Sequence, residues 1–254
     1  MKGVLGNEIV KRKNSGRRMI DLVYIKGKES INNDLELLYS LRSVEKYVGD
    51  YNNIFITGEC PDFIDKEKII YTPANDIGAP MTNHWHKVRE TIVQNELDGD
   101  FVLMYDDIFF VKPTNLTNYP FYQRGKLGES TAGGEHYRAT LLNARDFLVR
   151  KGYSAYDHEL HIPCIYNAEK FLELDRYFMA LKDDCQSMAV RSVYANMCCP
   201  EQPYRGDIKI RSQGVRVKDI IDVADCFSVS DDMFPFNTYD WLKMDLGKQS
   251  RWEK

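Results

Sequence analysis

The first half of the chain alternates short apolar runs with amphipathic stretches, and this order constrains the fold more than any other feature. β-Branched and aromatic residues dominate the apolar runs, so each run predicts a strand. The predicted strands are Met19–Ile25, Asn53–Thr57, Lys68–Tyr71 and Asp100–Tyr105, and Ile108–Val111 continues extended until Pro113. Apolar residues recur at helical spacing in Leu35–Tyr47 and Trp85–Leu97, which predicts two helices. The alternation predicts an α/β fold with a mixed sheet flanked by helices.

The second half of the chain is less regular. Gly125–Glu135 contains four glycines and predicts a flexible loop. The predicted helices are His136–Lys151, Ala168–Leu181 with Asn167 as N-cap, and Gln186–Met197. Val215–Val223 and Asp225–Val229 are expected to be extended or mixed. We therefore expect one domain over residues 19–254, preceded by a flexible basic arm over residues 1–18.

Composition excludes several classes of protein. With 254 residues, 43% of them hydrophobic, the chain has enough apolar mass to bury a core, so disorder is excluded as its main state. No apolar run approaches the roughly 18–20 residues of a membrane span. The six cysteines form no CxxC pair, which favours a reducing, cytoplasmic location. A net charge of −4 gives no general signature of nucleic-acid binding.

Polar residues follow three of the predicted strands. Lys26-Gly27, Gly58-Glu59 and Asp106-Asp107 each stand at a predicted strand end. In open α/β sheets, ligands bind outside the carboxyl ends of the strands. These three pairs are therefore expected to share one rim of the sheet.

Asp106-Asp107 is the strongest chemical feature. Two adjacent carboxylates repel each other, and a divalent cation such as Mg²⁺ or Mn²⁺ relieves that repulsion. The alternative is a solvated turn after a strand. The hypothesis requires that the two carboxylates are not merely paired with surface cations. A second pair, Asp231-Asp232, is expected either to complete the metal or acceptor site or to act as a helix cap.

Histidine and arginine provide further candidates. His161 precedes Pro163 in a polar stretch and could act as a base toward a hydroxyl group, with Asp157 holding its tautomer. His158 and His161 have the spacing of a helical metal pair, but Pro163 argues against a helix. Arg42 and Arg191 could each bind phosphate, or could be surface cations. The alternative for any lone histidine is a structural role; we prefer a structural or substrate-shaping role for His84 and His86.

Several strings resemble the Stealth-type sugar transferases, a family that includes capsular polysaccharide phosphotransferases and the catalytic part of the lysosomal-enzyme GlcNAc-phosphotransferase. The strings are IDLVYIKG, NNDLELLYSLRSVEKY, NIFITGECPDFI and FVLMYDDIFF. The resemblance covers roughly residues 19–113, with Tyr105 and Leu38 where the family has Asn and Arg. Later matches are short: His161 with Pro163, Arg191-Ser192, and Phe227 with Asp231-Asp232. The chain also resembles compact, single-domain glycosyltransferases.

The resemblance implies a GT-A-like, Rossmann-like fold, a UDP-linked sugar donor and Mn²⁺ or Mg²⁺. It implies His161 as base, Arg191 toward phosphate, and Asp106, Asp107 and Asp232 around the metal. The residues assigned to donor binding are Tyr24, Gly27, Asn33, Asp34, Arg42 and Asp106.

Three functions stay open. The first is transfer of a sugar to a hydroxyl group, on a glycan or on a hydroxylated DNA base. The second is transfer of sugar-1-phosphate with release of UMP. The third is a non-catalytic module that binds carbohydrate or nucleotide. The basic arm, Lys11–Arg18, would suit a polyanionic acceptor such as DNA, or would simply be a solvated terminus.

Overall fold

The computed structural model describes residues 19–28, 30–129, 133–179 and 187–254, apart from the side chain of Asn237. The basic arm predicted for residues 1–18 lies outside the described residues. The strands are β1 (Ile20–Lys26), β2 (Tyr51–Gly58), β3 (Ile70–Thr72), β4 (Asp100–Met104), β5 (Ile108–Phe110), β6 (Cys164–Asn167), β7 (Lys209–Ile210) and β8 (Cys226–Val229). The helices are α1 (Leu35–Tyr47), α2 (Pro80–Gln94), α3 (Glu135–Arg150), α4 (Ala168–Glu173), α5 (Asp175–Phe178), α6 (Val190–Cys198), α7 (Val217–Ile221), the π-helix η2 (Phe234–Thr238) and α8 (Tyr239–Asp245).

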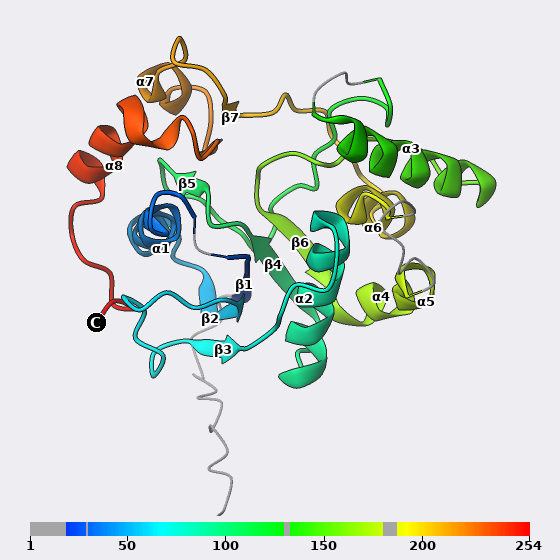
Figure 1. Ribbon diagram of the computed structural model, residues 1–254, viewed down its shortest axis with the longest axis horizontal. Helices are drawn as coiled ribbons and strands as arrows, with labels where there is room; N and C mark the ends of the chain where they lie inside the picture. The colour runs from blue at the N-terminus through cyan, green and yellow to red at the C-terminus, as the bar shows by residue number, and fades with distance from the viewer. Residues whose placement is uncertain (1–18, 29, 130–132, 180–186) are drawn as a thin grey trace, which may run out of the picture.

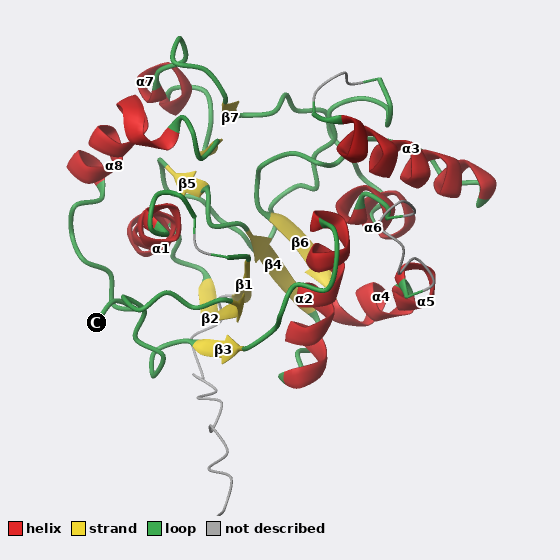
Figure 2. Ribbon diagram, viewed as in Figure 1, coloured by secondary structure: helices red, strands yellow, loops and turns green. Residues whose placement is uncertain are grey.

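The main sheet has the strand order β3-β2-β1-β4-β6 (Figure 1). The first four strands are parallel, and β6 runs antiparallel to β4. Helices lie on both sides of this sheet, with α1 on one side and α2, α4 and α6 on the other (Figure 2). The expected mixed α/β sheet flanked by helices is therefore confirmed.

The period-two pattern of the strands explains these layers. Leu22 and Tyr24 of β1 pack in the core shared with α1, whereas Val23 and Ile25 pack in the core shared with α2 and α6. Successive strand residues point to opposite faces, so a strand with helices on both faces must be apolar throughout. Such continuous apolar runs made the strands predictable from the sequence.

A second, smaller sheet has the order β5-β8-β7. Its apolar core contains Phe109 and Phe227, and Tyr39 joins it from α1. Helix α1 therefore packs against both sheets. Two serines fix the contact with β5: Ser40 Oγ donates to the carbonyl oxygen of Ile108 at 2.6 Å, and the amide of Phe110 donates to Ser43 Oγ at 3.0 Å. These bonds anchor the chain directly after Asp106-Asp107.

Most elements of the first half agree with the sequence predictions. Helix α1 has the predicted bounds, and the five predicted strands differ by at most two residues at either end. Helix α2 begins earlier than predicted, at Pro80, because a proline at the first helical position needs no hydrogen-bond partner for its nitrogen. Asn83 Oδ1 also accepts hydrogen bonds from the amides of Ile77 and Gly78 and so stabilises the turn before that helix.

The second half departs further from the predictions. The helix expected over Ala168–Leu181 is interrupted at Leu174, and its predicted end lies outside the described residues. Asn167 caps α4 as predicted, because its side chain accepts a hydrogen bond from the amide of Lys170 at 3.1 Å. Helix α6 starts at Val190; Gln186, the predicted start, is not described.

Val215–Val223, expected to be extended or mixed, contains the short helix α7 in its middle. Asp225–Val229 contains an extended strand, β8. The elements that the sequence did not predict are β6, β7, η2 and α8. Among the described helices, none is long and apolar enough to cross a membrane.

Gly58 closes β2 where it meets the end of β1. Its φ is +113°, and a Cβ placed there would lie 2.0 Å from the carbonyl oxygen of Lys26. Only glycine adopts this conformation at low cost, and only glycine leaves room for the neighbouring backbone.

We predict that Gly58→Ala lowers the free energy of unfolding by about 2 kcal/mol or more, since it adds backbone strain and a clash with a backbone atom. Urea denaturation provides the measurement. Gly49→Ala is the control, because no atom lies within 4 Å of its added Cβ. Equal stability of the two variants would contradict the prediction.

Candidate active site at the carboxyl edge of the main sheet

The site lies where the strand order reverses direction. From β1 the chain continues to β2 on one side, whereas β4 lies on the other side, so the boundary between β1 and β4 is a topological switch point. Lys26 ends β1, and its ammonium group contacts Asp106, which follows β4, at 3.5 Å. The same group contacts Asp34 at 2.8 Å and donates to the carbonyl oxygen of Lys28 at 2.8 Å. The sequence prediction that Lys26 and Asp106 share one rim is confirmed.

The loop between β1 and α1 has an unusual backbone. Asn33 and Asp34 have φ of 55° and 57°, which is the left-handed region that most residues avoid. Ser30 stabilises the loop: its amide donates to Asp34 Oδ1 at 2.9 Å, and its hydroxyl oxygen accepts from the amide of Asp34 at 3.1 Å. Gly27 lies exposed at the start of the loop with open space beside it. Asn33, Asp34 and Gly27 are thus at the rim, although the carboxylate of Asp34 already pairs with Lys26.

Asp106 lies among other carboxylates. Burial, followed by the negative charge of Asp107, raises the pKa of Asp106 to about 7, and Glu36 and Asp231 add to the effect while Lys26 opposes it. Glu36 accepts a hydrogen bond from the Ser30 hydroxyl at 2.8 Å, and no lysine or arginine among the described residues forms a salt bridge with it. The side chain of Asp106 is 30% exposed, so it reaches the surface of the rim. Negative charge is therefore in excess at this point.

Asp107 has a different environment. Its Oδ2 accepts from the ammonium group of Lys209 at 2.8 Å and from the Ser228 hydroxyl at 2.7 Å. Burial alone would raise the pKa of Asp107, but Lys209, His161 and Ser228 together lower it. The two adjacent carboxylates thus prefer opposite protonation states, which is typical of functional pairs. Asp107 is buried, so the alternative of a solvated turn does not apply to it. Its cation partner, Lys209, is only 16% exposed, so the two residues are not a surface ion pair.

His161 joins this group of residues. Its Nδ1 lies 3.2 Å from Oδ2 of Asp207, and it is close enough to Asp107 for each charge to shift the pKa of the other group. Burial is the main cause that lowers the pKa of His161, which favours its neutral imidazole. A neutral imidazole is the form that accepts a proton.

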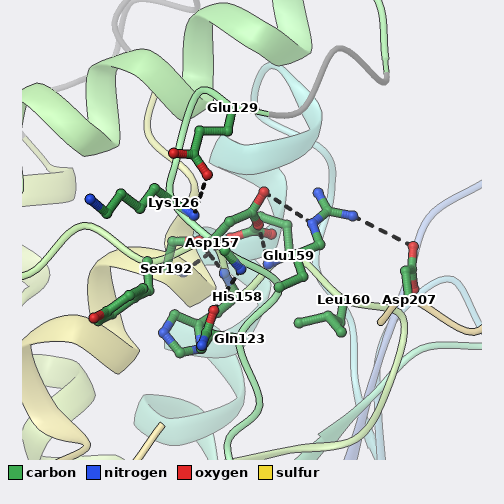
Figure 3. A network of polar contacts seen from close by, with 12 residues as sticks. Gln123, Lys126, Glu129, Asp157, His158, Glu159, Leu160, Ser192 and Asp207 are labelled. Carbon is green, nitrogen blue, oxygen red and sulfur yellow. Dashed lines mark hydrogen bonds and ion pairs between the residues drawn. The ribbon is translucent and has the colours of Figure 1, made fainter. Parts of the chain in front are cut away.

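His161 and His158 have other partners than the sequence predicted. Asp157 pairs with Arg124 at 3.0 Å and does not hold His161; Asp207 does. His158 is buried, and its two ring nitrogens lie 2.7 Å from the carbonyl oxygen of Tyr122 and 3.1 Å from Oε1 of Gln202. Figure 3 shows Asp157, His158 and Asp207 in this network. His158 therefore has no free nitrogen for a metal ion.

Arg191 is enclosed by the protein, which contradicts the expectation that its guanidinium is free to bind phosphate. Its guanidinium lies 3.5 Å from Glu159, donates to the carbonyl oxygen of Leu160, and stacks over the ring of Tyr105 at 4.7 Å. Figure 3 shows Glu159 and Leu160 in the same buried network. Arg191 supports the segment that leads to His161, but its charge is already paired.

Arg42 and Tyr24 also have other roles. Both ends of the Arg42 guanidinium donate to the carboxylate of Glu253, at 2.8 and 2.7 Å, which ties α1 to the C-terminal segment. Arg42 is two turns along α1 from the rim, about 10 Å away along the helix axis. Tyr24 is buried, and its hydroxyl group lies 3.0 Å from Ser40 Oγ. In this arrangement, neither side chain is available to bind a nucleotide-sugar donor.

Of the second acidic pair, the structure brings Asp231 to the site. The Asn32 side chain donates to the carbonyl oxygen of Asp231 at 3.0 Å, and the charge of Asp231 contributes to the raised pKa of Asp106. Asp231 and Asp232 are both exposed, and among the described residues no contact links the Asp232 side chain to Asp106, which speaks against the expectation for Asp232. The turn after β8 does not cap the C-terminus of a helix.

The fit of a metal ion depends on these carboxylates. In the part of the chain that the structure describes, no three His, Cys, Asp or Glu side chains form a group that could hold a metal ion by themselves. Mg²⁺, however, is commonly bound by one or two carboxylates together with substrate phosphates. Asp106 and Asp107 provide hard oxygen ligands of that kind, and the excess negative charge around Asp106 favours a cation. The residues therefore fit a metal ion that binds together with a phosphorylated ligand.

A polar pocket of about 490 Å³ lies elsewhere. Its lining includes Gln123, Tyr153, Tyr156, Asn196 and Gln202, and does not include Asp106, Asp107 or His161. The amide groups of Asn196 and Gln202 already hydrogen-bond to backbone carbonyl oxygens. The pocket therefore offers fewer free polar groups than its composition suggests.

The chain matches no protein-family model, and a search of curated proteins finds no significant match. Function therefore has to be inferred from the residues at the rim.

The raised pKa of Asp106 predicts a pH-dependent stability difference. The folded protein favours protonated Asp106, so this preference stabilises the fold below the ordinary pKa of 3.8 and is lost as pH rises through about 7. In the absence of divalent cations, the free energy of unfolding at pH 8 should be higher for Asp106→Asn than for the wild type by about 1–2 kcal/mol. This figure allows for the partial exposure of the Asp106 side chain, which weakens the effect. The gain should shrink between pH 7 and pH 4. A difference that does not vary with pH in urea denaturation would contradict this.

Arg191→Met should destabilise the protein by about 3–5 kcal/mol, because it leaves Glu159 buried without its cation. Arg42→Met is the comparison, since the Arg42 side chain is more exposed and should cost less. Urea denaturation at pH 7 measures both variants. A loss for Arg191→Met no larger than that for Arg42→Met would mean that the buried pair is not required for the fold.

Proposed function

We propose that this protein is a metal-dependent glycosyltransferase of the GT-A-like type, which moves a sugar from a UDP-linked donor to a hydroxyl group. The observation that carries the proposal is the group of carboxylates at the switch point, where Asp106 lies among Asp107, Glu36 and Asp231 and the charge of Lys26 opposes their effect on it. Such a group favours a divalent cation, and a cation at this place suits a ligand with phosphates.

The sheet supports the same proposal. Parallel strands β3-β2-β1-β4 place the acidic pair at the carboxyl edge, beside the loop that contains Gly27, Asn33 and Asp34. This is where doubly wound sheets bind nucleotides. Non-glycine residues in the left-handed region concentrate at functional sites, where the surrounding structure maintains the strain. The loop with Asn33 and Asp34 is therefore the proposed contact for the nucleotide.

Asp106 and Asp107 would hold Mn²⁺ or Mg²⁺. Such an ion, when bound, neutralises the charge that develops on a departing diphosphate. Lys26 keeps the donor loop and the acidic pair together, because it contacts Asp34 and Asp106 at once. Lys209 and Ser228 hold Asp107 in the ionised form that a cation requires.

His161 is the proposed base toward the acceptor hydroxyl group. It is 25% exposed, its lowered pKa favours the neutral imidazole, and it is close to Asp107. Removing a proton from the acceptor increases the nucleophilicity of the attacking oxygen, and such general-base catalysis typically contributes 10²–10⁴-fold. The acceptor is a glycan or another hydroxylated molecule; a hydroxylated DNA base remains the alternative linked to residues 1–18.

Transfer of sugar-1-phosphate is the less supported alternative. Attack at phosphorus needs cations around the phosphoryl group, and Arg191, the cation that the family resemblance assigns toward phosphate, is paired with Glu159. Analysis of products by mass spectrometry separates the two reactions. UDP would support glycosyl transfer, whereas UMP as the sole nucleotide product would refute it. Binding of a nucleotide sugar with no turnover of any acceptor would favour the non-catalytic module.

We predict that Mn²⁺ together with a UDP-sugar raises the melting temperature, and that Asp107→Ala abolishes this shift while the protein stays folded, because the cation loses a ligand. Asp231→Asn should weaken Mn²⁺-dependent binding more than Asp232→Asn, since the charge of Asp231 acts on Asp106. A screen of nucleotide sugars by thermal shift provides the measurement. A normal metal-dependent shift in Asp107→Ala would remove the metal assignment.

His161→Gln should lower turnover by about 10²–10⁴-fold and change donor affinity little, because the base acts on the acceptor. Steady-state kinetics and donor titration measure the two effects separately. An equal loss of both would make His161 a binding residue.

A further inference from the structure

We propose that Asp207 is the positioning residue of this site: it fixes His161 in the tautomer with hydrogen on Nδ1, so that Nε2 presents its lone pair to the acceptor. The inference deepens the proposed function and rests on it for the catalytic role of His161. The tautomer itself is a property of the folded chain and can be measured without any substrate.

Two contacts define the arrangement. Asp207 Oδ1 accepts a hydrogen bond from the backbone amide of His161 at 3.2 Å, and Oδ2 lies 3.2 Å from Nδ1 of the same residue. One carboxylate therefore holds both the backbone and the ring of His161. An ionised carboxylate only accepts hydrogen bonds, so Nδ1 must carry the hydrogen atom.

Arginines keep Asp207 ionised and in place. Arg211 donates to Oδ2 at 2.8 Å, and Arg124 lies 3.5 Å from the same oxygen. Arg124 is fixed in turn by Asp157 at 3.0 Å. Burial would raise the pKa of Asp207, but its hydrogen bonds from His161 and Arg211 lower it well below the usual range. The carboxylate cannot rotate away without losing several charged contacts.

The other groups that face His161 leave Nε2 available. Besides Asp207, the charges of Lys209 and Asp107 also act on the pKa of His161. Among the described residues, no hydrogen bond to Nε2 is found, and the side chain is 25% exposed. His158 provides the contrast, because both of its ring nitrogens have partners. Of these two described histidines, His161 alone combines a fixed Nδ1 with a free Nε2.

In the proposed step, the proton of the acceptor hydroxyl group moves to Nε2 of His161 while the acceptor oxygen forms a bond to the anomeric carbon of the sugar. The bond from that carbon to the diphosphate oxygen breaks, and its electron pair leaves with the diphosphate. His161 becomes an imidazolium, and the negative charge of Asp207 stabilises it.

The test combines imidazole ¹⁵N NMR spectroscopy with kinetics. The wild-type spectrum at neutral pH should show Nδ1 protonated and Nε2 unprotonated for the signal that disappears in His161→Gln. Asp207→Asn should alter this tautomer signal and lower turnover by about 10²–10⁴-fold with little change in donor affinity. Asp225→Asn is the matched control, since Asp225 also pairs with an arginine, Arg205, at 2.7 Å but does not contact His161.

Each outcome decides the proposal. A wild-type signal with hydrogen on Nε2 would overturn it, as would an unchanged tautomer and unchanged turnover in Asp207→Asn. If that variant does not fold, the wild-type spectrum alone decides the tautomer. If the tautomer is as expected but no donor supports transfer, the positioning by Asp207 stands and the proposed glycosyltransferase function fails.

Discussion

The buried ammonium group of Lys26 is the interaction on which the site depends. Its side chain is 2% exposed, and it contacts Asp34, Asp106 and the carbonyl oxygen of Lys28. A buried charge is tolerated only when it is paired and hydrogen-bonded, so these acceptors must face it. The contact joins the end of β1, the loop before α1 and the end of β4. Without it, nothing would tie the acidic pair to the loop before α1 through a shared charge.

The acidic pair shows how position changes the chemistry of identical side chains. Asp107 faces Lys209 and Ser228 and stays ionised, whereas Asp106 shares Lys26 with Asp34 and faces further carboxylates. The pair thus combines one fixed negative charge with one that depends on a cation or a proton. In the proposed function, Asp106 and Asp107 would hold a divalent cation, which would neutralise the negative charge that Lys26 leaves uncompensated.

The sequence predicted the rim better than the partners that complete it. Strand ends such as Lys26 and Asp106 are visible because apolar runs stop there. Asp207 and Lys209 are not visible, since they lie just before and at the start of a two-residue strand that no sequence pattern marks, and they reach the site only through long-range packing. A guanidinium is equally consistent with a phosphate ligand and with a buried pair, so the sequence could not show that Arg191 pairs with Glu159. Residue type indicated the chemistry, but the tertiary contacts decided which groups were free.

The serines of α1 have a consequence for motion. Ser40 and Ser43 supply to β5 the donor and acceptor that a neighbouring strand would normally provide. Because the two hydroxyl groups are three residues apart on one face of the helix, a rotation of α1 by a single residue would break both bonds together. Helix and acidic turn are therefore coupled as one rigid unit, and any ligand that shifts the start of α1 would also displace the carboxylates.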